Sequence, residues 1–360
     1  MPIEFIGMIG VRPEGADGAA VHVIGGAIHP AWLRDFSRAH EEADFDKVLV
    51  GYTSTAADGF VVATYAAAHT ERLGYLIAHR PGFVAPTLAA RKAASLDHFS
   101  NGRIALHIIT GGSDADQAKD GDWLDHDTRY RRTDEYLTVL RRVWTEDRPF
   151  DHAGEFYRVT GAFSEVKPVQ SPHIPLYFGG ASEAAHRIGA RHCDVYMLWG
   201  EPLAAICARI AEVRAVAARV GREPRFSVSL RPIIAATEAQ AWERARTILD
   251  RVRAKQGDRA TPPPPQAVGA QRLVDFAQKQ EVYDKRLWTP IAAASGGQGN
   301  TTALVGTPEQ VAESLLDYYA LGVTTILIRG FDPLHDAIEY GRELIPLVRA
   351  EVARRDRAAA

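Results

Sequence analysis

The sequence predicts an α/β fold, a (β/α)8 TIM barrel with insertions after strands 1, 4 and 7. Eight short apolar runs alternate with segments whose apolar residues recur every three or four positions, along nearly all of the 360 residues. The runs are almost continuously apolar, as expected for parallel strands covered on both faces. A doubly wound open sheet is the alternative, but no GxGxxG motif follows the first run.

The eight expected strands are, in chain order, Ile3–Ile9, Lys47–Gly51, Gly74–Ala78, Ile104–Thr110, Pro175–Gly179, Asp194–Trp199, Arg225–Ala235 and Thr324–Arg329. Apolar stripes at helical spacing lie between them, such as Leu203, Ile206, Ile210 and Val213. Cys207 is in register with this stripe, so we expect it in the core, and Cys193 is also expected to be buried. Two cysteines allow neither a disulfide framework nor a four-cysteine metal site.

Four segments exceed the minimal strand–helix repeat: Val11–Pro30, Gly111–Arg129, Glu155–Ser171 and Lys255–Gly306. The third is expected to form a hairpin or another excursion before the fifth strand. The fourth contains TPPPP and ASGGQGNTT, and we expect it to form a mobile lid over the barrel mouth. Residues 1–360 are therefore expected to form a single barrel domain with a lid at about 255–306.

Composition argues against several functions. The net charge of −3 provides no excess of cations for a nucleic acid partner. No apolar run reaches the roughly 18 residues of a membrane span, and the first ten residues lack signal-peptide features, so we expect a cytoplasmic enzyme without a membrane partner. The thirteen histidines are scattered without HExxH spacing, so no metal is expected. GxSxG and P-loop motifs are also missing.

The residues that end each strand are the first candidates for function, because barrel enzymes place their sites there. In FGGASEAAHR, Ser182 is positioned as the N-cap of a helix whose free N–H groups favour an anion, although Ser182 could equally serve only as the cap. His79 suits proton transfer at a barrel mouth, or else bonds a neighbouring loop. His107 lies inside the apolar strand IALHIIT, which favours a core or supporting role. Without other reactive motifs, the barrel is expected to use a phosphate-bearing cofactor such as a flavin.

Five stretches also carry a likeness to a known family: RPGFVAPTLAARKAASLDHFSNGR (Arg80–Arg103), IITGGSDADQAKDGDWLDHDTRY (Ile108–Tyr130), PLYFGGASEAA (Pro175–Ala185), YMLWGEP (Tyr196–Pro202) and ALVGTPEQVAESLLDYYALGV (Ala303–Val323). Together, and in this order, they resemble the alkanesulfonate monooxygenase branch of the bacterial-luciferase-like flavin-dependent monooxygenases. The stretches span most of the chain.

The resemblance implies a two-component enzyme that takes reduced FMN (FMNH2) from a separate NAD(P)H-dependent flavin reductase. With O2 it would oxygenate a small organosulfur compound, and in the sulfonate enzymes the C–S bond then breaks to give an aldehyde and sulfite. A homodimer or homotetramer is also implied. The expected cofactor-binding residues are Ala57, Thr110, His126, Tyr130, Gly180, Ala181 and Ser182. His126, Tyr130 and Ser182 would hold the phosphate and ribityl chain, and Thr110 would lie beside the isoalloxazine ring.

The substrate side departs from the sulfonate enzymes. This chain has Ala56 where they carry cysteine, and Ser229 and Arg231 where they carry arginine and histidine. Phe331 and Pro333 replace tyrosine and histidine, and the lid arginine falls near Ser295. The expected catalytic set is His79, Trp199, Arg231 and Arg329. Trp199 would wall the substrate pocket, and each arginine would either hold a substrate oxyanion or form a structural ion pair.

Three other functions fit the same barrel. One is a luciferase-like monooxygenase with a non-sulfonate substrate, and another is an oxidoreductase that transfers hydride with the deazaflavin F420. The third is a barrel that binds flavin without catalysis. The sequence does not distinguish these functions from one another, because substrate choice depends on how the lid residues shape the pocket.

Overall fold

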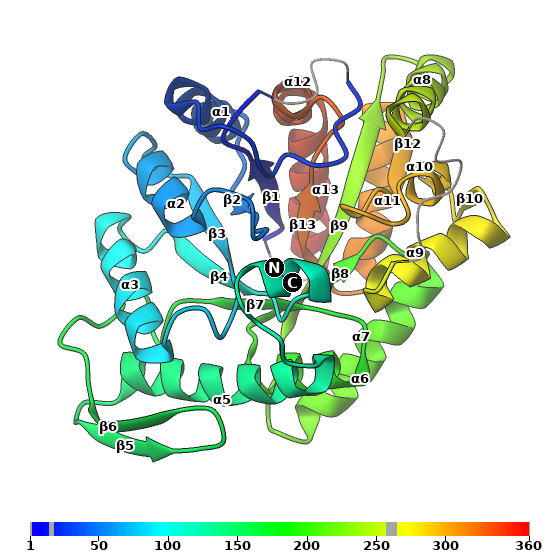
Figure 1. Ribbon diagram of the computed structural model, residues 1–360. Coiled ribbons are helices and arrows are strands. Elements are labelled where there is room, and N and C mark those ends of the chain that lie inside the picture. The colour runs from blue at the N-terminus through cyan, green and yellow to red at the C-terminus, as the bar shows by residue number, and fades with distance from the viewer. Residues whose placement is uncertain (1, 14–17, 257–264, 360) are drawn as a thin grey trace.

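Eight parallel strands close into a barrel in the computed structural model, which describes residues 2–13, 18–256 and 265–359 (Figure 1). The strands are β1 (Glu4–Ile9), β2 (Lys47–Val50), β3 (Gly74–His79), β4 (Ile104–Ile108), β7 (Leu176–Gly179), β8 (Val195–Trp199), β9 (Arg225–Ile234) and β13 (Val323–Ile328). The ring closes because β9 pairs with both β8 and β13, and β13 pairs with β1. The expected TIM barrel is confirmed.

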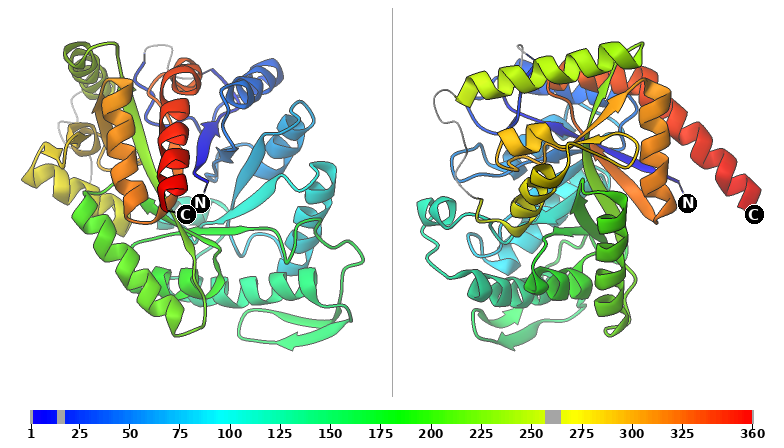
Figure 2. Two further views of the ribbon diagram at one scale, coloured as in Figure 1. Left: turned by 180° about the vertical axis from the view of Figure 1, so that it is seen from behind. Right: turned by 90° about the vertical axis from the view of Figure 1, so that its right-hand side faces the viewer.

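Helices surround the strands on the outside, and α13 extends beyond the barrel at the C-terminal end (Figure 2). The outer helices are α1 (Pro30–Glu42), α2 (Gly59–Ala67), α3 (Pro86–Phe99), α5 (His126–Thr145), α6 (Glu183–His192), α7 (Leu203–Ala218), α11 (Pro308–Ala320), α12 (Pro333–Glu339) and α13 (Ile345–Ala359). Several begin at polar caps that the sequence provides, among them Asp58, Asp125, Ser182 and Thr307.

The strands separate two apolar layers. Ile6, Leu76, Ala105, Tyr177 and Leu327 pack together in one buried cluster, whereas their strand neighbours join the larger cluster with the helices. Successive side chains of a strand point to opposite faces, so the first cluster fills the barrel and the second lies outside it. This alternation decides which strand-end residues can face the barrel mouth.

The insertions form partly regular structure. Gly111–Arg129 contains α4 (Asp114–Lys119). A hairpin of β5 (Phe150–Ala153) and β6 (Arg158–Ala162) lies beside α5 (Figure 1), and it begins before the expected segment Glu155–Ser171. After β9 come α8 (Glu238–Gln256), α9 (Val268–Lys279), β10 (Val282–Tyr283), β11 (Leu287–Trp288), α10 (Pro290–Ala294) and β12 (Ala303–Gly306). Because β12 pairs with β9, the end of this insertion extends the sheet. Most of the TPPPP motif lies outside the described residues.

Cys207 corrects one expectation. It is exposed on α7, whereas Cys193 is buried as expected. The buried stripe of α7 runs through Ile206, Ile210 and Val213, and Cys207 follows Ile206 by a single residue, which turns its side chain about 100° away from that stripe. Among the described residues, no helix combines the length and apolarity that a membrane crossing requires.

Candidate active site

A cavity of about 600 Å³ opens at the carboxyl ends of β4, β7 and β8. Its size lies within the usual range of small-molecule sites, roughly 300–1,000 Å³. The walls bring together most of the residues expected to bind cofactor, namely Thr110, His126, Tyr130, Gly180, Ala181 and Ser182. The walls also include Trp199 from the expected catalytic set.

The turn between β7 and α6 is held in one conformation by its surroundings. The carbonyl of Gly180 accepts hydrogen bonds from Tyr196 Oη at 2.9 Å and from Arg209 Nη2 at 3.0 Å. A Cβ atom at position 180 would lie 2.5 Å from the Cβ of Ala185, so only glycine fits. Ser182 caps α6 by accepting from the Ala185 N–H at 3.2 Å. The start of α6 therefore faces the cavity with N–H groups that favour an anion.

His126 and Tyr130 form the neighbouring wall. Asp125 caps α5, so His126 is the first helical residue, and its ring lies 4.8 Å from the ring of Tyr130, centroid to centroid. The two residues thus share one helix face, as their spacing predicts. Burial raises the pKa of Tyr130, while the hydroxyls of Ser182 and Thr110 act in the opposite direction. The phenol of Tyr130 therefore lies between β4 and the α6 cap.

Two arginines and two carboxylates, Asp114 and Glu201, line the cavity. Arg129 and Arg209 both line it and are buried. Arg129 Nη2 donates to Asp114 Oδ1 at 2.8 Å, and Arg209 Nη2 contacts His186 Nε2 at 2.8 Å. Neither arginine was predicted from the sequence, because each lies inside a helix pattern that also suits a solvated charge.

Thr110 supplies a buried hydroxyl near the phenol of Tyr130, and this hydroxyl forms no hydrogen bond of good geometry with the described residues. Buried polar groups are rarely left without a hydrogen bond. The hydroxyl borders the cavity, so a polar atom of a bound ligand can form the missing hydrogen bond. A capped helix start, three hydroxyls and two arginines fit the phosphate and ribityl chain of a flavin mononucleotide.

His107 lines the cavity, in contrast to the supporting role expected from its apolar strand. Ala105 lies in the barrel interior, and His107 follows it by two residues and therefore also points inward. A Cβ atom on Gly179 would lie 3.7 Å from His107 Nε2. Burial lowers the pKa of His107 to about 4, so the imidazole is neutral near pH 7. Strand alternation was the signal that could have identified it.

Trp199 lies against the start of α9. A Cβ atom on Gly269 would lie 3.4 Å from Trp199 Cε3, so α9 approaches the indole closely. Residues 266–269 line the cavity beside Trp199. The insertion after β9 therefore covers part of the cavity, although its action as a mobile lid stays a prediction.

His79 and Ala57 do not line the cavity. His79 points out of the barrel, where its Nε2 lies 2.7 Å from Tyr136 Oη and its ring meets Phe60 edge-on. Burial lowers the pKa of His79 to about 4. Ala57 packs against the outer apolar cluster. These positions do not favour proton transfer by His79 or cofactor contact by Ala57, because both residues pack outside the barrel.

Arg231 and Arg329 lie near the loop that precedes β12 and do not line the cavity. The N–H groups of Arg231 donate to five backbone carbonyls, those of Ala20, Val21, Gly299, Asn300 and Gly330. Arg231 is thus committed to structure, although through carbonyls and not through the ion pair that was the structural alternative.

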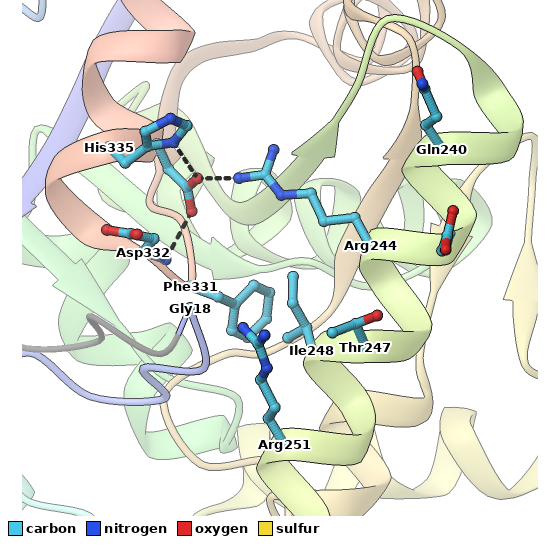
Figure 3. A pocket seen from close by; sticks show the side chains of 11 residues that line it. Gly18, Gln240, Arg244, Thr247, Ile248, Arg251, Phe331, Asp332 and His335 are labelled. Carbon is cyan, nitrogen blue, oxygen red and sulfur yellow. Dashed lines mark hydrogen bonds and ion pairs between the residues drawn. The ribbon is translucent and has the colours of Figure 1, made fainter.

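A second hollow of about 530 Å³ lies between α8 and α12 (Figure 3). Within the described residues, His335, Asp336 and Glu339 offer ligand atoms within 4.8 Å of one another. Arg244 forms ion pairs with both carboxylates, at 2.9 Å for Glu339. A cation would have to displace this guanidinium, so we assign no metal to the hollow.

A (β/α)8 barrel with a cavity at the carboxyl ends of its strands is typical of an enzyme. A family model described as luciferase-like monooxygenase matches residues 3–325. The chain belongs to the luciferase-like monooxygenase family, and it is accordingly an oxidoreductase of the flavin-dependent monooxygenase type.

Three solved structures illustrate the range of similar barrels. A riboflavin lyase with modified FMN and riboflavin has 20% identity and a TM-score of 0.78, covering 98% of this chain and 92% of its own. The EDTA monooxygenase of Chelativorans sp. BNC1 has 20% identity and a TM-score of 0.76, with coverages of 98% and 94%. An F420-dependent secondary alcohol dehydrogenase with an F420–acetone adduct has 15% identity and a TM-score of 0.68, with coverages of 97% and 99%.

Proposed function

We propose that the protein is the oxygenase component of a two-component system in the cytoplasm. It takes FMNH2 from an NAD(P)H-dependent flavin reductase and uses O2 to oxygenate a small organosulfur compound of the alkanesulfonate type. One oxygen atom enters the substrate and the other leaves as water. Cleavage of the C–S bond then gives an aldehyde and sulfite, while the flavin leaves oxidised. The working unit is a homodimer or homotetramer.

The observation that carries this proposal is the meeting of Thr110, Tyr130 and Ser182 around one cavity. Ser182 and the start of α6 bind the phosphate, Tyr130 and His126 flank it, and the Thr110 hydroxyl bonds the ribityl chain or ring edge. Bound flavin supplies the redox chemistry with O2. Trp199 and α9 exclude water from the reacting end, since they cover the cavity beside His107.

Reduced flavin is favoured over F420 by the sequence stretches shared with the sulfonate enzymes. One similar structure nevertheless contains F420, so both cofactors belong in the binding experiment. Anaerobic titration of the protein with FMNH2 and with reduced F420 should give tight binding of the former only. Preferential binding of F420 would replace the proposal with hydride transfer.

Substrate class is tested with the complete system of protein, NADH, FMN and a flavin reductase. A panel of alkanesulfonates, dialkyl sulfones and sulfur-free analogues is incubated in air, and sulfite and aldehyde are measured together. Equal amounts of sulfite and aldehyde from a sulfonate are expected. Product from a sulfone or a sulfur-free compound alone would retain the monooxygenase but reject the sulfonate. FMN binding with no product from any compound would indicate a barrel that binds flavin without catalysis.

A further inference from the structure

The loop that precedes β12 lies between two arginine side chains, of which Arg231 is buried and Arg329 is partly buried. Arg231 of β9 and Arg329, which directly follows β13, both donate to the carbonyl of Gly299. The Arg231 Nη2 to Gly299 O distance is 3.2 Å. Two guanidinium groups therefore share one acceptor at the carboxyl end of the barrel.

Arg231 has no hydrogen-bonding capacity left for a ligand. A guanidinium carries five N–H groups, and those of Arg231 make five hydrogen bonds to backbone carbonyls. Its flat face lies over the ring of Phe331, with Cζ 4.6 Å from the ring centroid. Arg231 thus binds three chain segments together.

Within the described parts of the chain, Arg329 has only two hydrogen-bonding contacts. Nη1 lies 2.7 Å from the sulfur of Met8, and Nη2 donates to Gly299. Its Nε is buried and has no partner among the described residues. Burial is the only cause that lowers the pKa of Arg329, to about 10, so the side chain remains charged near pH 7 without an acidic partner in the described parts of the chain.

The described residues around Arg329 include no carboxylate paired with it. The pKa of His22 is lowered by desolvation and then by the positive charges of Arg329 and Arg231. His22 Nε2 lies 3.4 Å from the neutral amide oxygen of Gln298. A buried cation without an anion is costly, and proteins normally pair such groups.

The position of Arg329 relates it to the cofactor cavity. In the ring of eight strands, β13 is four strands away from β4, so the two lie on opposite sides of the barrel (Figure 1). The cavity lies at the ends of β4, β7 and β8, and Arg329 is at the end of β13. A ligand held by Arg329 would therefore enter the barrel mouth from the side opposite the phosphate-binding turn.

We propose that Arg329 binds an oxyanion group, a sulfonate or a carboxylate, at the charged end of the substrate. The N–H groups that Arg329 does not use can donate to two oxygens of such a group, and the anion neutralises the buried charge. The inference rests on the proposed function, because it assumes that substrate binds at the mouth of this barrel. It adds which residue holds the anionic group of that substrate.

Anion binding can be measured without flavin, which separates this inference from cofactor binding. The probes are ethanesulfonate, propionate and inorganic sulfate, with propionamide as the neutral match of propionate. Calorimetric titration and thermal unfolding of the full chain are expected to show binding of ethanesulfonate or propionate and none of propionamide. Binding of sulfate alone would indicate an inorganic anion site and would overturn the assignment to substrate.

The decisive variant is Arg329→Met, which removes the charge and keeps a similar length. Affinity for the organic anion should fall at least tenfold, and Arg329→Lys should retain part of it. Arg354→Met is the matched control, since Arg354 is an exposed arginine of α13 that pairs with Glu351. This control removes one positive charge elsewhere and should leave anion affinity unchanged.

Stability without ligand distinguishes a binding role from a structural one. Arg329→Met should unfold at the same temperature as the natural protein or a few degrees higher, because an uncompensated buried charge is removed. The Gly299 carbonyl keeps its bond from Arg231. A markedly lower unfolding temperature with unchanged anion affinity would contradict the proposal and make Arg329 a structural residue.

Discussion

The side chain of Arg231 connects several chain segments at the mouth of the barrel. It joins the loop after β1, the loop before β12 and Gly330, which follows β13, through backbone carbonyls. We predict that Arg231→Met lowers the free energy of unfolding by about 3 kcal/mol or more, because several buried carbonyls lose their donor at once. Urea unfolding measures this directly. A loss below about 1 kcal/mol would show that the carbonyls find other partners.

Loss of the Thr110 hydroxyl should weaken ligand binding more than it lowers the stability of the fold. We predict that Thr110→Val weakens FMN binding by about tenfold, the effect of one lost hydrogen bond. Stability should not fall, because the hydroxyl forms no hydrogen bond of good geometry with the described residues. The matched control is Thr133→Val, whose buried hydroxyl donates to the Arg129 carbonyl at 2.9 Å. It should lose stability while FMN affinity stays the same; the reverse pattern would contradict this account of Thr110.

At the scale of elements, an ion pair between the partly exposed Arg272 of α9 and the buried Glu201 helps to attach α9 to the barrel beside the cavity. Both carboxylate oxygens of Glu201 accept from Arg272 of α9, from Nε at 2.7 Å and from Nη2 at 2.5 Å. Glu201 is only 3% exposed and lines the cavity. A buried carboxylate that loses its partner is destabilising by roughly 3–5 kcal/mol. The pair therefore holds α9 over Trp199.

We predict that Arg272→Met increases amide hydrogen exchange across residues 268–279 more than in the barrel strands. The control is Lys285→Met, which breaks an exposed pair with Glu313, and such pairs contribute at most about 1 kcal/mol. Faster exchange of α9 in the first variant only would support an attachment that can open. Unchanged exchange in both variants would mean that apolar packing alone fixes α9.

The order of elements was predictable because each strand and helix carries its own periodic pattern. The runs Gly74–Ala78 and Ile104–Thr110 match β3 and β4 to within two residues at each end. The pairing of β12 with β9 could not be predicted, since Ala303–Gly306 is a four-residue apolar run whose partner depends on the path of the whole insertion. Short runs are ambiguous without tertiary context.

At the scale of the whole molecule, acid should unfold the protein through its buried histidines. His40 and His79 are almost fully buried, and burial lowers the pKa of each to about 4, below an unfolded value of about 6.5. Between these values the unfolded chain binds more protons, so stability falls as pH falls through that window. Each histidine accounts for about 2 kcal/mol between pH 7 and pH 5. The free energy of unfolding, measured with urea between pH 7 and pH 5, should fall accordingly, and it should fall less steeply in His79→Gln. An equal pH dependence in the two proteins would contradict the role given to His79.

The cofactor half of the site was predictable and the substrate half was not. Thr110, Tyr130 and Ser182 come from two successive strand–helix connections, whose motifs are local and therefore visible in sequence. The residues on the substrate side depend on whether each strand-end side chain points into or out of the barrel. They also depend on contacts with loops that are distant in the sequence. His79 points outward and His107 inward, and Arg231 is occupied by carbonyls up to 211 residues away along the chain. Sequence position alone does not reveal such contacts.

The central claim is that the turn after β7 and the start of α5 hold a flavin phosphate. The most direct test compares the affinities of FMN and riboflavin, which differ only in that phosphate, for the natural protein and for a variant with Ser182→Ala and Tyr130→Phe. FMN should bind at least tenfold more tightly than riboflavin to the natural protein, and the variant should lose most of this preference while riboflavin affinity changes little. Equal affinities in the natural protein, or a preference that survives in the variant, would contradict the claim.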